Sequence, residues 1–189
     1  MKAYVEYVAG LNAKLKHVEE FVNTVKECAE DIDVHESSLG HPSVNSVSLA
    51  SILVNVFNVD AIAHVRLADV NHLVFLSLAY AAQFFGVDKL LVTVGDPPRI
   101  GKPVGYLTSE EALKLARVYG VGKLKIGAIL SLRFPLEKIY ERLRRDFNFY
   151  LVLRFSEKNL DKFAKVSEKA TGLGKELYPY VIVATEKEY

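Results

Sequence analysis

The feature that most constrains the fold is a regular alternation of short apolar segments with longer segments of helical period. The short segments are rich in β-branched and aromatic residues, and the longer ones repeat apolar residues every three to four positions. Strands are predicted over residues 3–9, 32–34, 61–67, 89–94, 124–130, 148–155 and 178–185. Helices are predicted over residues 11–31, 44–57, 69–86, 109–120, 135–145 and 157–171. Such alternation is typical of a parallel sheet with right-handed crossovers, so we expect an α/β fold.

Two parallel architectures fit this pattern. The chain has 189 residues, whereas a complete (β/α)₈ barrel typically has about 250. Length alone therefore favours an open, doubly wound sheet. However, no glycine-rich dinucleotide fingerprint follows the first strand, and no Walker A motif occurs. In both architectures the ligand lies at the carboxyl ends of the strands. We expect a single domain over residues 1–189.

Composition excludes several classes of function. The chain has 24 Lys and Arg against 23 Asp and Glu, a net charge of +1, which does not favour a nucleic-acid or anionic membrane surface. Its single cysteine, Cys28, cannot form an internal disulfide, so a cytoplasmic location is expected. Glu6 comes too early for a signal peptide. The uncharged run 70–87 is interrupted by polar residues, and it is interpreted as a buried helix rather than a membrane span.

Polar residues stand at or near the ends of several predicted strands. Glu6 lies inside the first strand, where it either faces water from an edge strand or points inward as a general acid with a raised pKa. His64 and Arg66 share one face of the third strand by the period-two rule, and Asn71 follows shortly after. A lone histidine there fits a packed core position, but an arginine beside it favours a ligand or a counter-charge.

The loop after the second strand contains His35, Glu36 and His41. These residue types bind metals, but their spacing matches no short paired-histidine motif. A polar loop with serines that cap the next helix explains the segment better, and no metal site is predicted.

The fourth strand ends in Gly95 and Asp96, followed by a proline-rich loop with Lys102 and Tyr106. The stretch "LLVTVGDPP…GKPVGY" resembles the methylenetetrahydrofolate reductase family, in which a strand ending in Gly-Asp precedes a Gly-Lys-Pro-x-x-Tyr loop. Two further segments are similar to that family. They are "YVEY" at residues 4–7, which resembles the family's first strand with its glutamate between aromatic residues, and "AHVRL" at residues 63–67, which resembles the family's third strand, where a histidine lies against the flavin.

The resemblance implies a TIM-barrel-like (β/α) repeat that binds FAD, takes electrons from NAD(P)H and reduces methylenetetrahydrofolate to methyltetrahydrofolate. Glu6 would protonate the folate as its five-membered ring opens, and Asp96 would tune the flavin and hold the folate. The flavin contacts would be His64, Gly95, Asp96, Lys102 and Tyr106. Arg66 and Asn71 would bind a folate-type or archaeal-type pterin substrate.

The sequence departs from the family in its second half. The segment after the fifth strand is short, the sixth strand lacks the folate-binding glutamine, and the repeat is truncated after about the seventh strand. Arg142, Arg144 and Arg145 fit either a cofactor diphosphate or a solvated helix face. Three readings therefore stay open: a reductase with FAD, with FMN or with no flavin; a non-catalytic pterin-binding or partner-binding member; and an unrelated lyase-type or metal-dependent barrel. A homodimer, or a second subunit that completes the barrel, is expected.

Overall fold

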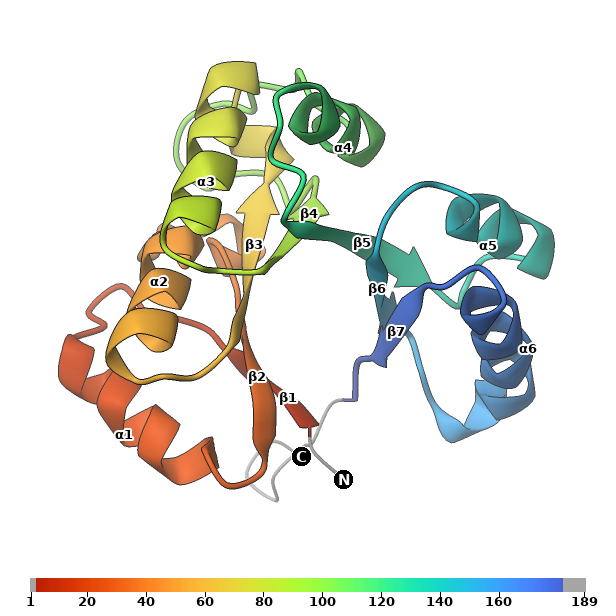
Figure 1. Cartoon of the computed structure of the whole chain (residues 1–189), viewed down its shortest axis with the longest axis horizontal. Coiled ribbons are helices and arrows are strands. Elements are labelled where there is room, and N and C mark those ends of the chain that lie inside the picture. Colours follow the sequence, from red (N-terminus) through yellow and green to blue (C-terminus); the bar gives the residue numbers. More distant parts are fainter. Residues whose placement is uncertain (1–2, 182–189) are drawn as a thin grey trace. The chain divides into compact units, whose positions relative to one another are not determined.

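The computed structural model describes residues 3–181 and divides into two compact units, with the boundary between Ile126 and Gly127 (Figure 1). The expectation of one domain over residues 1–189 stays a prediction.

The first unit is a four-stranded parallel sheet with its strands in chain order. The strands are β1 (Ala3–Tyr7), β2 (Ala29–Val34), β3 (Ala61–Arg66) and β4 (Lys89–Thr93). The helices are α1 (Leu15–Val25), α2 (Ser46–Val56), α3 (His72–Phe84) and α4 (Ser109–Val118), with 3₁₀ turns η1 (Ser38–Gly40) and η2 (Leu67–Asp69). In this unit each strand is followed by a helix, as the alternation predicted.

The second unit contains three strands that also pair in parallel and in chain order. They are β5 (Lys125–Ser131), which begins at the end of the first unit, β6 (Phe149–Leu153) and β7 (Glu176–Pro179). Its helices are α5 (Leu136–Leu143) and α6 (Leu160–Thr171), and a 3₁₀ turn η3 (Glu157–Asn159) precedes α6.

The two faces of the first sheet differ in chemistry. Tyr7 packs its ring against Phe21 of α1, with 4.7 Å between the ring centroids, so this face of β1 meets the helices. Glu6 points the other way because side chains alternate along a strand. Glu6 pairs in register with Asp33 of β2, and the face away from α1 is therefore the one that carries charge.

Further charged residues share this face. Asp31 of β2 forms an ion pair with Lys89 of β4 near the amino ends of the strands, and Lys89 also lies 5.6 Å from the ring centroid of Tyr4. The apolar core of the unit lies on the opposite face, where Ile32 and Val34 of β2 are fully buried. The charged face is thus organised as pairs, which is the condition for burying charge.

The predicted helices and strands are confirmed, but several of them begin or end at residues other than those predicted. α1 begins at Leu15 rather than at residue 11, because residues 10–13 form a turn closed by a hydrogen bond from Ala13 N to Gly10 O. β2 begins at Ala29, within the segment predicted as helix. β7 begins at Glu176, and the predicted strand residues 182–185 lie outside the described residues.

The start of α4 differs from the interpretation of its sequence by one residue. Thr108, not Ser109, is the N-cap, and its hydroxyl accepts a hydrogen bond from Glu111 N. Across residues 3–181, no helix is long and apolar enough to cross a membrane.

Candidate functional site

Four ionisable side chains meet at the carboxyl ends of β1, β2 and β3: Glu6, Asp33, His35 and His64. Asp33 Oδ1 lies 2.7 Å from His64 Nε2, and Asp33 Oδ2 lies 3.7 Å from His35 Nε2. His35 Nε2 is also 3.3 Å from Glu6 Oε1. The side chains of Asp33 and His64 are only 5% and 6% exposed. We call these four residues the carboxylate–histidine cluster.

Local structure fixes the histidines of this cluster. The imidazole rings of His35 and His64 stack, with centroids 4.1 Å apart and planes tilted by 32°. Nδ1 of His35 lies 3.4 Å from the Ser38 hydroxyl, within hydrogen-bond distance. The buried Ser46 hydroxyl donates to the main-chain carbonyl of His64. Neighbours from outside the cluster therefore hold the ring of His35 and the main chain at His64.

The cluster shifts the protonation of its members. Burial opposes the charge on Asp33, but His64 and His35 outweigh that cost and hold the pKa of this carboxyl below its ordinary value. Burial likewise opposes the charge on His35, but Asp33 and then Glu6 outweigh it and raise the pKa of the imidazole. The arrangement can hold and pass protons between neighbouring oxygen and nitrogen atoms.

Arg66 lies on the same strand as His64, two residues further on, and is used to hold loops. Its Nε donates to Asp69 Oδ2 at 2.6 Å. Its two terminal nitrogens donate to the main-chain carbonyls of Ser37 at 3.0 Å and Asp96 at 2.8 Å. One guanidinium therefore ties together the segments that follow β2, β3 and β4.

The glycine before Asp96 is explained by the same side chain. Gly95 has a φ of +82°, and a Cβ placed there would lie 3.1 Å from Nη1 of Arg66. A left-handed backbone and a close approach both favour glycine. The Gly-Asp motif at the end of β4 thus has a structural role, in which the backbone accommodates Arg66.

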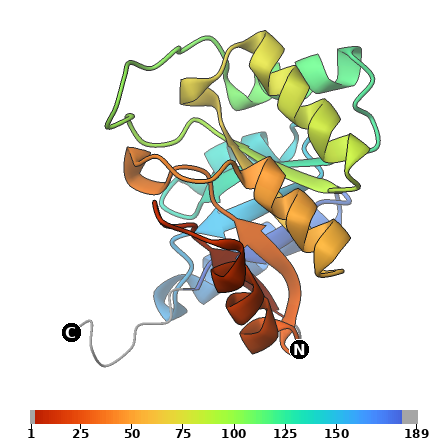
Figure 2. The same cartoon turned by 90° about the vertical axis from the view of Figure 1, so that its left-hand side faces the viewer.

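The long loop after β4 folds back over the neighbouring strand ends (Figure 2, green). Arg99 N donates to Gly40 O at 2.9 Å, and Val104 N donates to Ala68 O at 2.7 Å. Lys102 is exposed, and Tyr106 is 66% exposed. The loop is anchored by its backbone and leaves its polar and aromatic side chains at the surface.

The structure brings some of the sequence-predicted site residues together. Glu6 and His64 meet through His35, and Arg66 holds the backbone of Asp96. The Asp96 carboxylate is exposed and has no hydrogen-bond or ion-pair partner among residues 3–181. Asn71 caps α3, where its side chain accepts from Val74 N at 3.0 Å. Roles for these residues in ligand binding stay predictions.

Asp33 and His35 are the members of the cluster that sequence reasoning did not single out as a pair. Asp31, Asp33 and His35 occupy alternate positions, so the period-two rule places all three on one face of β2. Of the three residues weighed as metal ligands, only His35 lies in the cluster. Glu36 accepts from Ser46 N at 2.6 Å, and His41 is exposed.

One combination of side chains in residues 3–181 has the composition and spacing of a metal site. The donor atoms of Asp33, His35 and His64 all lie within 4.8 Å of one another. The sequence alone predicted no metal site in this chain.

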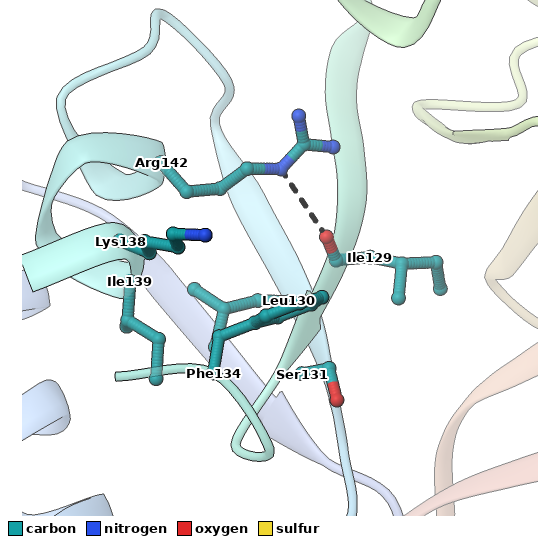
Figure 3. A pocket seen from close by; sticks show the side chains of 7 residues that line it. All are labelled: Ile129, Leu130, Ser131, Phe134, Lys138, Ile139 and Arg142. Atoms are coloured by element: carbon teal, nitrogen blue, oxygen red, sulfur yellow. Dashed lines mark hydrogen bonds between the residues drawn. The ribbon is translucent and has the colours of Figure 1, made fainter. Parts of the chain in front are cut away.

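The second unit has a cavity of its own, of about 220 Å³, between β5 and α5 (Figure 3). Leu130, Phe134 and Ile139 provide apolar walls. Arg142 Nε lies 3.4 Å from Ile129 O, and its guanidinium lies 5.3 Å from the Phe147 ring centroid. Arg142 thus contacts the strand and the aromatic ring and is not on a fully solvated helix face, and a role toward a cofactor diphosphate stays a prediction.

Comparisons with known proteins bear on the fold. No family model and no curated protein matches the sequence. Solved structures do match. A mutant tryptophan synthase α-subunit from Pyrococcus furiosus aligns over 98% of this chain and 80% of its own, with a TM-score of 0.63 and 12% identity. An aldolase, QR15, aligns over 92% and 77%, with a TM-score of 0.60 and 16% identity.

A third similar structure is that of a protein that binds a folate. It is an uncharacterized protein from Clostridium thermocellum that binds two copies of 5-methyl-5,6,7,8-tetrahydrofolic acid. It aligns over 92% of this chain and 59% of its own, with a TM-score of 0.54 and 9% identity. Likeness at such low identity establishes the fold alone. The chain is a TIM-barrel-like (β/α) repeat with seven strands in residues 3–181, which confirms the predicted fold class and excludes the doubly wound alternative.

Proposed function

We propose that this chain reduces a pterin carrier of one-carbon units from the methylene to the methyl level, at the carboxyl ends of β1 to β4. The observation that carries the proposal is the position of Glu6. Its carboxylate faces away from α1 and lies 3.3 Å from His35 Nε2. In a fold of this class, reacting groups lie at that end of the strands.

The residue types suit the reaction. Reduction of a methylene group held between two nitrogens breaks one carbon–nitrogen bond, adds a hydride to the carbon and leaves an amine that needs a proton. A flavin, when bound, supplies the hydride, and NAD(P)H restores the reduced flavin. Glu6 would deliver a proton from its carboxyl group to the leaving nitrogen, beside His35, whose Nε2 lies 3.3 Å from Glu6 Oε1.

A flavin fits some of the residues expected to hold it. Asp96, Lys102 and Tyr106 are exposed on the anchored loop after β4, where an aromatic ring and main-chain groups are accessible. His64, by contrast, is 6% exposed and faces Asp33. We therefore assign the flavin ring to the loop and not to His64. The proposal allows either FAD or FMN as the flavin.

The choice of a pterin rests on two supports. One is the resemblance of residues 4–7, 63–67 and 90–106 to methylenetetrahydrofolate reductases. The other is that a protein with a similar fold binds 5-methyl-5,6,7,8-tetrahydrofolic acid. A folate-type or an archaeal-type pterin satisfies both.

A second copy of the chain is also part of the proposal. The side chains of Leu73 and Phe84 at the two ends of α3 are 73% and 83% exposed, and Tyr80 between them is 44% exposed. Apolar side chains exposed along one helix favour an interface. A cytoplasmic location, inferred from the single Cys28, is proposed as well.

Binding measurements on the purified chain test the function. Calorimetry with 5-methyltetrahydrofolate, and absorbance titration with FAD and FMN, are made in the presence of a metal chelator. Binding of both ligand classes supports the reductase. Pterin binding without flavin binding overturns it in favour of a non-catalytic pterin-binding member. Absence of both overturns the pterin assignment.

A further inference from the structure

We propose that Asp33, His35 and His64 form a binding site for a divalent transition-metal ion of the zinc class, at the carboxyl ends of β2 and β3. The inference goes beyond the proposed function and does not depend on a pterin or a flavin. It rests on the donor atoms, their spacing, their burial and their charge.

The donor set is one that such ions use. Two imidazole nitrogens and one carboxylate are common ligands of zinc and of iron, and they leave further coordination positions open. The three side chains come from two neighbouring strand ends, and their donor atoms lie within 4.8 Å of one another. Glu6 Oε1, 3.3 Å from His35 Nε2, stands where a fourth ligand or a metal-bound water would be.

Part of the spacing agrees with coordination geometry, and the set as a whole, whose donor atoms lie within 4.8 Å of one another, would contract on binding an ion. Donors bound at about 2.1 Å, with angles between 90° and 120°, are about 3.0 to 3.6 Å apart. The distances from His35 Nε2 to Glu6 and to Asp33 are 3.3 Å and 3.7 Å. The distance from Asp33 to His64, 2.7 Å, is shorter because a hydrogen bond joins them. An ion would replace this bond and separate the two atoms by a few tenths of an ångström.

One atom of the cluster is left without a hydrogen bond. Nε2 of His35 is buried and has no hydrogen-bond partner, although two carboxylates lie near it. A buried polar atom in this state costs free energy. Nδ1 of the same ring lies near the Ser38 hydroxyl. Ligating histidines are held in this way, with one nitrogen on a neighbouring group and the other turned toward the ion.

The charges also balance. Bound as ligands, the carboxylates of Asp33 and Glu6 would bring two negative charges, and imidazoles bound through a neutral nitrogen would add none. A doubly charged ion would neutralise the pair inside a site where Asp33 is 5% exposed. The second candidate for such an ion, the exposed His41 in the same loop, has no acidic partner among the described residues.

Cobalt and zinc titrations test the site in the full chain. After removal of metal with a chelator, Co²⁺ is added and the visible absorption is followed, and Zn²⁺ then displaces it in competition with a chromophoric chelator. We expect one ion per chain. His35→Ala should weaken binding at least about 100-fold, since loss even of an outer partner costs 10- to 100-fold.

Two further variants keep the test decisive. His41→Ala removes a histidine six positions away and should leave affinity unchanged. Asp33→Asn keeps a hydrogen-bond acceptor for His64 but removes the charge, and it should weaken binding even if a His64 variant does not fold. Circular dichroism checks each fold. Binding that is absent in the wild type, or equal in the wild type, His35→Ala and Asp33→Asn, overturns the site. Neither result bears on pterin binding, which is measured with chelator present.

Discussion

Glu6 is one residue away from Tyr7, and the two side chains face opposite sides of β1. Tyr7 packs on Phe21 in the helix layer, and Glu6 approaches His35. The alternative that the sequence left open, an outward glutamate on an edge strand, would have exchanged these positions. Because Glu6 lies on the charged face, its substitution should affect chemistry more than packing.

We predict that Glu6→Gln slows pterin reduction by about 10² to 10⁴, the usual contribution of a general acid. The amide keeps the size of the side chain but cannot deliver the proton. Reduction of bound flavin by NAD(P)H should be unchanged. Stopped-flow absorbance measures the two half-reactions separately. Glu19→Gln, on the exposed surface of α1, is the control. Equal loss in both half-reactions would show that Glu6 is structural.

A second prediction concerns the contribution of Gly95 to stability. Gly95→Ala should lower the free energy of unfolding by about 1 to 3 kcal/mol, because alanine is strained at positive φ and its Cβ meets Arg66. Gly101 has nearly the same φ, +83°, but open space around its Cβ position. Urea unfolding of Gly95→Ala and Gly101→Ala therefore isolates the contact. Equal losses in the two variants would contradict it.

The sequence predicted individual site residues unevenly. Glu6 and His64 could be selected because a charged residue in an apolar strand is unusual. The sequence does not single out Asp33, because the predicted strand "IDV" is too short to display the alternation of its side chains. The role of Arg66 toward Ser37 and Asp96 could not be found, since it uses main-chain oxygens that any residue would offer.

At the scale of elements, the contact between β5 and β6 depends on a residue without a side chain. Gly127 pairs in register with Phe149, and a Cβ on Gly127 would lie 2.2 Å from that ring. Backbone pairing and ring packing leave no room for a methyl group. The fully buried Phe149 has no exposed direction in which to move.

Gly127→Ala should therefore destabilise the protein by about 1 to 3 kcal/mol or more, the usual cost of overpacking. Phe149→Leu in the same chain should restore part of the loss. Thermal unfolding of the single and double variants measures both effects. Gly122→Ala, with open space around its Cβ position, should be close to neutral. A similar melting temperature for Gly127→Ala and Gly122→Ala would contradict the prediction.

The capping interactions at the start of α4 predict that stability depends on pH. Glu111 accepts from Thr108 N and Oγ1, and the backbone bond and then the side-chain bond lower its pKa. A lowered pKa in the folded state means that the carboxylate stabilises the helix above its unfolded pKa, and that the contribution is lost as pH falls through the lower, folded value.

Thermal unfolding between pH 7 and pH 3 checks this. The wild type should lose stability relative to Glu111→Gln below about pH 4.3, the ordinary pKa of a glutamate. Thr108→Ala should cost about 1 kcal/mol at neutral pH, as for other N-caps. Parallel pH curves for the wild type and Glu111→Gln would show that the capping box does not titrate.

Element order was predicted more successfully than element boundaries. Alternation of period is a property of long segments, so all seven strands and six helices were found. Boundaries depend on single hydrogen bonds, as at Thr108, where two adjacent hydroxyl residues compete for one capping position. The strand order decides which strand ends lie next to one another, and this order cannot be read from the sequence.

At the scale of the whole molecule, the exposed apolar side chains of α3 predict self-association. If α3 is an interface, the wild type should sediment as a dimer at micromolar concentration, and Phe84→Lys should shift it toward the monomer. Sedimentation velocity measures both. Lys123→Glu, a charge change at an exposed position, is the control. A monomeric wild type would contradict the dimer.

Arg66 has a consequence for how such a chain can change over generations. It holds Ser37 and Asp96 by their main-chain carbonyls, and those oxygens are the same whatever residue occupies the position. Replacing the side chain at position 37 or 96 therefore leaves the acceptor of each hydrogen bond in place. We expect substitutions at these two positions to change the loop surface while the buried guanidinium of Arg66 keeps the backbone in place.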